Sequence, residues 1–164
     1  MSLAAAPDRT TFVRALEAEL VAYNGLCELL REEQASLTQG DVERLQQLTE
    51  RKARQVEQLA ALGATRSAYL QDLRLGADPA GMEAWLQTGA GSQRQALTQT
   101  WQNLLDAARE ARTLNDLNGG LLATRLNHSQ SALAALHAAG RQHLVYGPDG
   151  QNDFRAANRD LGRA

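Results

Sequence analysis

Residues 92–140 read SQRQALTQTWQNLLDAAREARTLNDLNGGLLATRLNHSQSALAALHAAG, and this stretch decides the fold. Its apolar positions recur in alternating steps of four and three residues, which is the spacing of one helix face. An unbroken helix over this range would be roughly 70 Å long, at a rise of about 1.5 Å per residue. The positions of the stripe are Leu97, Trp101, Leu104, Ala108, Ala111, Asn115, Asn118, Leu122, Leu126, Ser129, Leu133 and Leu136.

Two earlier segments, residues 8–37 and 42–75, carry similar stripes and predict helices of about 45–50 Å. Gly40 is suited to end the first helix, and Asp41 is suited to cap the second. Because the connection is so short, we expect the two helices to fold back as an antiparallel hairpin. Long basic residues interrupt the second stripe, where their stems can lie along apolar surface.

A short helix is predicted over residues 79–89, with Asp78 as its N-cap and Pro79 at its first position. Trp85 on this helix is interpreted as a packing anchor. The composition agrees with helices throughout, because the chain has no isoleucine and only 4% aromatic residues, and β-branched and aromatic residues are those that favour strands. We therefore predict an all-α protein: an elongated antiparallel helical bundle or coiled coil of three long helices plus one short helix.

We expect this bundle to occupy residues 1–145 and a flexible tail to occupy residues 146–164. The tail contains the turn-forming run YGPDG, and Phe154 and Leu161 share one face of a short helix that is not stable alone. Tyr146 beside the turn is either an interface anchor or a packing residue at the helix end.

Charge and hydropathy exclude several classes of function. The formal net charge is -2, so there is no basic field for nucleic acid. No segment approaches the ~20 apolar residues of a membrane span, and the first residues lack the features of a signal peptide. We expect a cytoplasmic protein that does not insert into a membrane. Cys27, the only cysteine, is interpreted as a small core residue.

Catalytic and cofactor motifs are missing from the sequence. There is no phosphate-binding glycine loop, and His128, His137 and His143 do not pair at metal-ligand spacing. Adjacent glutamates such as Glu32 and Glu33 are interpreted as solvated helix surface. We predict no enzyme activity, no cofactor and no metal.

The polar patch in the last long helix raises the main question about function. Asn115, Asn118, Gly119 and Gly120 interrupt the apolar stripe, and the two asparagines form either a buried polar layer that fixes register or a polar spacer at a wet position. The glycines permit a bend or a close approach between backbones. Since this helix is longer than its partners, it must extend past them, break at the glycines, or pair with another chain. Leu122, Leu126, Leu133 and Leu136 then form an apolar face that needs a cover.

Three stretches carry a family resemblance. They are LLREEQASLTQGDVERLQQLTERKARQVEQL at 29–59, NDLNGGLLATRL at 115–126, and LVYGPDGQ at 144–151. In order and spacing they resemble the FlgN family of bacterial flagellar export chaperones.

This resemblance implies a non-enzymatic cytoplasmic chaperone for type III export. Its clients would be hook-associated proteins of the hook–filament junction, whose premature self-association it prevents, and it would deliver them to the cytosolic domain of the export gate. Tyr146 and Gly147 would contact the gate. The client-facing residues would be Leu122, Leu126, Leu133, Leu136, Phe154 and Leu161. The alternative is a homodimeric coiled-coil scaffold or adaptor with no role in export, and a homodimer in the absence of client is compatible with either.

Overall fold

The computed structural model describes residues 8–145, together with the side chains of residues 8–141. These residues form α1 (Arg9–Gln39), α2 (Val42–Asp72), α3 (Pro79–Gln87) and α4 (Gly91–Val145), with no strand in this range. The predicted all-α class is confirmed. The chain divides into two compact units, Met1–Leu121 and Leu122–Ala164, so the boundary falls inside α4.

The helix starts follow local capping chemistry. The side chain of Asp8 accepts a hydrogen bond from Thr11 N at 2.7 Å, and Asp78 caps α3 in the same way. At the α1–α2 connection, Gly40 has a φ of 79°, and Asp41 Oδ1 accepts from Arg44 N at 2.9 Å. A left-handed residue followed directly by a cap reverses the chain in a minimal number of residues. The predicted hairpin and caps are confirmed.

Two predicted helix ends are wrong. α2 ends at Asp72 rather than at residue 75, because Arg74 adopts a φ of 59° and Leu75 N donates to Leu70 O at 2.8 Å, which is the Schellman termination normally built on glycine. α4 starts at Gly91 and continues through Gly140 to Val145. A single glycine lowers the stability of a helix by only about 1 kcal/mol, so Gly140 does not force α4 to end.

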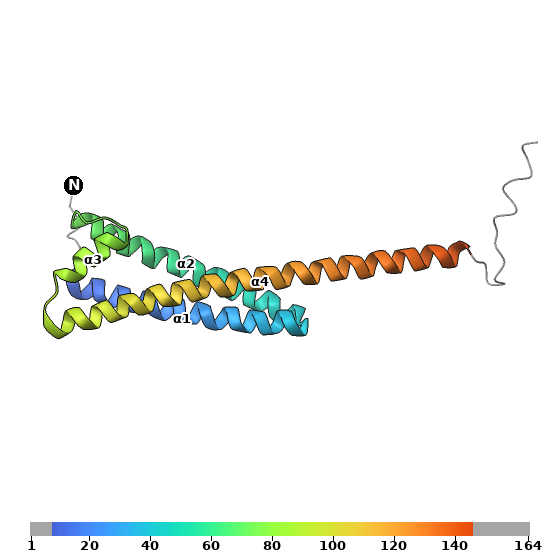
Figure 1. Cartoon of the computed structure of the whole chain (residues 1–164), viewed down its shortest axis with the longest axis horizontal. Coiled ribbons are helices and arrows are strands. Elements are labelled where there is room, and N and C mark those ends of the chain that lie inside the picture. The colour runs from blue at the N-terminus through green and yellow to red at the C-terminus, as the bar shows by residue number, and fades with distance from the viewer. Residues whose placement is uncertain (1–7, 146–164) are drawn as a thin grey trace, which may run out of the picture. The chain divides into compact units, whose positions relative to one another are not determined.

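The main core lies at the end of the first unit where α1 begins, α2 ends and α3 packs (Figure 1). Phe12 stacks on Tyr69 with ring centroids 4.0 Å apart, and Trp85 contacts Phe12 edge-on at 4.6 Å. Trp85 is only 1% exposed, which confirms the packing interpretation. α3 approaches the preceding loop so closely that a Cβ at Gly81 would lie 1.7 Å from Gly76 O, so only glycine fits there. The core residues are Phe12, Leu16, Tyr69, Leu70, Met82, Trp85, Leu86, Leu97, Trp101 and Leu104.

A smaller apolar cluster continues along α1, α2 and α4. Its buried members are Ala22, Leu26, Cys27, Leu30, Leu59 and Ala111. The Cys27 thiol lies 3.4 Å from Ala107 O, and burial raises the pKa of this thiol. The interpretation of Cys27 as a core residue is confirmed, because a buried protonated thiol is a poor nucleophile.

A buried ion pair also joins α1 to α2 within the first unit. Glu19 is 2% exposed and accepts two hydrogen bonds from Arg66, at 2.9 and 3.2 Å. The Arg66 guanidinium also lies 5.2 Å from the ring centroid of Trp101 on α4. The basic residues on the α2 stripe therefore do more than cover apolar surface: Arg66 neutralises a carboxylate that would be costly to bury alone.

Candidate functional site

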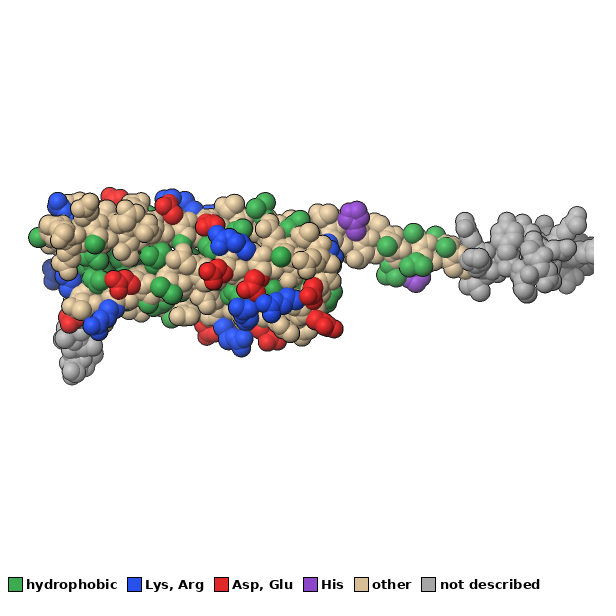
Figure 2. Space-filling model, turned by 90° about the horizontal axis from the view of Figure 1, so that it is seen from below, with side chains coloured by type: hydrophobic (Ala, Val, Ile, Leu, Met, Phe, Trp, Pro, Cys, Tyr) green, Lys and Arg blue, Asp and Glu red, His purple; other side chains and the backbone are tan. Residues whose placement is uncertain are grey.

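The apolar face of the second unit is uncovered. Every side chain from Gly119 to Arg141 is exposed, and Figure 2 shows hydrophobic side chains at the surface of this unit. Residues 122, 126, 133 and 136 share one helix face by their spacing. The exposed fractions on this face are 48% for Leu122, 54% for Leu126, 57% for Leu133 and 70% for Leu136. We call these four residues the leucine face.

Local sequence explains why the described part of this unit is helical without a buried core. Alanine, leucine and arginine are strong helix formers and dominate it. α4 continues through Gly119 and Gly120, so the alternative of a helix break at these glycines is wrong. A Cβ at either glycine would meet nothing within 4 Å. No close contact between α4 and the other described residues therefore requires glycine at positions 119 and 120.

A polar layer lies next to the glycines, inside the first unit. Asn118 is 3% exposed, and its Nδ2 donates to Leu30 O and to Glu33 Oε2, both at 2.8 Å. Glu33 Oε1 in turn accepts from Lys52 Nζ at 2.6 Å. The layer thus connects α1, α2 and α4. Of the two alternatives for the asparagines, the buried layer holds for Asn118, whereas Asn115 is exposed.

The interpretation of Glu33 as solvated surface is wrong, because its side chain is buried between Lys52 and Asn118. A sequence signal for this pairing exists. Glu19 and Glu33 lie two heptads apart on α1, and Lys52 and Arg66 lie two heptads apart on α2. In an antiparallel hairpin that spacing brings each acid opposite one base at the same register.

Asn118 is the last buried residue of α4 among those whose burial the structure describes. The internal packing of α4 therefore ends at the polar layer, and the leucine face begins within one turn of it. Four other predicted site residues lie outside the described part of the chain: Tyr146, Gly147, Phe154 and Leu161.

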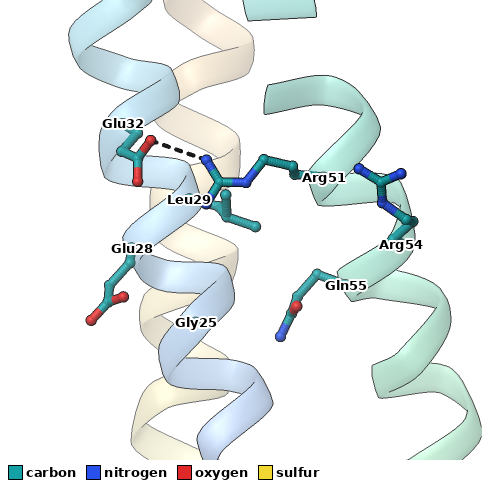
Figure 3. Close-up of a pocket in the computed structure, with 7 residues that line it drawn as sticks. All are labelled: Gly25, Glu28, Leu29, Glu32, Arg51, Arg54 and Gln55. Carbon is teal, nitrogen blue, oxygen red and sulfur yellow. Dashed lines mark hydrogen bonds and ion pairs between the residues drawn. The ribbon is translucent and has the colours of Figure 1, made fainter. Parts of the chain in front are cut away.

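A polar hollow of about 300 Å³ lies between α1 and α2. It is lined by Gly25, Glu28, Leu29, Glu32, Arg51, Arg54 and Gln55. Arg51 reaches across from α2 to Glu32 on α1, with Nη1 3.3 Å from Oε2 (Figure 3). Arg44 also pairs with Glu32, at 2.5 Å. Ion pairs at the surface of the hairpin therefore border the hollow.

The described residues contain no group of three or more His, Cys, Asp or Glu side chains that could hold a metal ion. Within the same range, none of the helices combines the length and apolar character needed to cross a membrane. The leucine face is the candidate functional site.

The fold and the site define a class of protein: an α-helical bundle whose last helix carries an uncovered apolar face. The chain belongs to the FlgN family, whose model, described as "FlgN protein", matches residues 3–153. A curated relative from Yersinia enterocolitica serotype O:8 / biotype 1B is 31% identical over 82% of this chain and 84% of its own, and is named "Flagella synthesis protein FlgN". A second Yersinia enterocolitica protein of that name is 31% identical over 80% and 82% of the two chains. No solved structure matches the chain.

Proposed function

We propose that this protein is a cytoplasmic chaperone of flagellar type III export that binds hook-associated proteins of the hook–filament junction. It keeps them from associating prematurely and delivers them to the export gate, with no enzymatic step. Family membership and the names of the relatives support a role in flagellar synthesis. The observation that carries the chaperone role is the leucine face, because a soluble chain rarely leaves such a surface uncovered without a binding role.

The geometry of the leucine face suits a helical client segment. Its four leucines are spaced as the anchors of a helix-in-groove or coiled-coil contact. A client segment with a complementary stripe would bury both apolar faces, so neither would remain available for self-association. Phe154 and Leu161 extend this proposed client surface into the tail.

The expected strength of the contact is moderate. Full burial of a leucine contributes about 1.5–3 kcal/mol, and the leucine face is roughly half exposed. Covering it therefore contributes roughly 3–6 kcal/mol before the costs of ordering the two partners. A contribution of that size favours a complex that forms reversibly.

The proposal is tested by capture of hook-associated proteins. The tagged full chain is immobilised, exposed to lysate of flagellated cells, and the co-purifying proteins are identified by mass spectrometry. We expect a hook-associated protein to be retained by the native chain and lost when Leu122 and Leu136 are both replaced by serine. Retention by neither chain, or equally by both, would contradict the proposal.

Contact with the export gate is a separate part of the proposal and rests on Tyr146 and Gly147. We expect Tyr146→Ala to weaken binding to the purified cytosolic domain of the gate while client binding stays close to native. Surface plasmon resonance with each partner in turn measures both. If the substitution removed both interactions, Tyr146 would have a structural role instead.

A further inference from the structure

Residues 117–145, the last part of α4, differ in charge from the part of the chain that precedes them. Between Leu117 and Val145 there is no aspartate or glutamate, and Asp116 is the last acidic residue before the end of α4. The same range contains two arginines, Arg125 and Arg141. Because the whole chain has a formal net charge of -2, a basic helical segment follows an acidic remainder.

The two arginines border the leucine face. At about 100° per residue, Arg125 lies beyond Leu136 on one side of the face and Arg141 lies beyond Leu126 on the other. Both side chains are exposed. Arg141 Nε donates to His137 O at 3.4 Å, which is a contact inside the same helix. An apolar stripe with basic flanks is therefore presented to solvent.

We infer that the leucine face selects an amphipathic helix whose flanking positions are acidic. This inference rests on the proposed function in one respect, that a client segment occupies the face. Flanking charges of opposite sign set partner choice and orientation in helix pairs, because like charges at these positions repel. A partner helix with glutamates or aspartates beside its apolar stripe complements Arg125 and Arg141, and a basic one does not.

The same charges disfavour other occupants. A second copy of the segment contains no acidic residue in the range 117–145 to face Arg125 or Arg141. An anionic membrane surface attracts each basic residue by only about 1 kcal/mol, and the segment has no Trp, Tyr or Phe over that range to anchor it at the interface. Binding of nucleic acid also requires a larger cluster of basic residues than these two arginines.

The test uses two designed helical peptides and the full chain. The peptides share one leucine heptad stripe and differ only at the flanking positions, which are glutamate in one and lysine in the other. Fluorescence anisotropy of labelled peptide gives each Kd. We expect the glutamate peptide to bind about tenfold more tightly in about 0.1 M salt and the ratio to approach one in about 1 M salt, because the Debye length falls from about 10 Å to about 3 Å.

Charge reversal supplies the matched comparison. The double variant R125E/R141E should reverse the preference and bind the lysine peptide more tightly. The control variant R14E/R54E makes the same change of net charge at exposed α1 and α2 positions and should keep the native preference. Equal binding of both peptides by the native chain would overturn the inference, as would reversal of the preference in the control variant.

The outcomes separate this inference from the proposed function. If the native chain retains a hook-associated protein but does not discriminate between the peptides, the charge inference fails and the chaperone proposal stands. If the peptides are discriminated as expected but no hook-associated protein is retained, the surface is correctly described and the client is not. Preferential binding to anionic vesicles, or to a second copy in sedimentation, would overturn the inference directly.

Discussion

Replacing Leu126 and Leu133 by aspartate should abolish client binding while the bundle stays folded. The two residues are 54% and 57% exposed and share the leucine face. Because neither belongs to either apolar cluster of the first unit, their loss removes no internal packing. The main effect on the isolated chain is the lower helix propensity of aspartate, about 0.5 kcal/mol per site.

The expected loss of affinity follows from the exposed fractions. Full burial of a leucine side chain contributes about 1.5–3 kcal/mol, so covering the exposed half of each residue contributes roughly 0.75–1.5 kcal/mol. Losing both costs roughly 1.5–3 kcal/mol, or about 10- to 150-fold in Kd. Aspartate adds the cost of holding a carboxylate against apolar groups. We therefore expect affinity to fall by at least about 100-fold.

The assay is a titration of purified hook-associated protein by isothermal calorimetry, with circular dichroism of each variant as the folding check. The uncharged pair L126N/L133N separates the loss of apolar contact from the effect of charge, and its affinity should fall by the same factor of about 10 to 150. The control V21D/V42D places the same charges at residues of the first unit that are 70% and 74% exposed. It should bind client with native affinity.

Two results would refute this reasoning. If L126D/L133D kept native affinity at native helicity, the client would bind elsewhere. If sedimentation at micromolar concentration showed a tight dimer of the native chain that L126D/L133D converts to monomer, the leucine face would be a homodimer interface and the scaffold alternative would hold.

Three further predictions concern the first unit. Asn118→Ala removes the amide bonded to Leu30 O and Glu33 Oε2 and should lower the free energy of unfolding by about 1–3 kcal/mol in urea titrations, whereas alanine at the exposed Asn115 should change it by less than about 0.5 kcal/mol. Burial raises the pKa of the Cys27 thiol, so alkylation by iodoacetamide should be slow in the folded chain and rapid in denaturant; rapid labelling of folded chain would place Cys27 at the surface. Hydrogen bonds from Thr11 lower the pKa of the Asp8 carboxyl, so the cap stabilises the fold above the pKa of an unfolded aspartate and is lost as pH falls through the folded one. Asp8→Ala should therefore lower the thermal midpoint at pH 7 and leave it unchanged in strong acid, and an equal loss at both pH values would contradict this.

Much of the fold was predictable because its signals are local. A cap such as Asp41 and a left-handed glycine such as Gly40 act within one turn, so a reading of neighbouring residues finds them. The end of α2 was missed because Arg74 occupies a conformation that sequence reasoning reserves for glycine. The continuation of α4 through Gly140 was missed because a glycine only weakens a helix and does not end it.

The candidate site was predictable in part. The spacing of Leu122 to Leu136 placed the leucines on one face, because helical periodicity alone decides that. Helical periodicity does not show which of Asn115 and Asn118 is buried, because both lie on the stripe. Only Asn118 donates a hydrogen bond to the carboxylate of Glu33, and this depends on how α1 packs against α4.

The amino-acid sequence by itself determined the helices, their caps, the hairpin and the leucine stripe, because each depends on interactions within a few residues. Tertiary structure alone decided which polar groups are buried and which apolar ones are uncovered. Glu19 and Glu33 are buried because the register of α1 against α2 brings Arg66 and Lys52 opposite them. A carboxylate is stable in the interior only with such a partner, and the partner is far away in the chain.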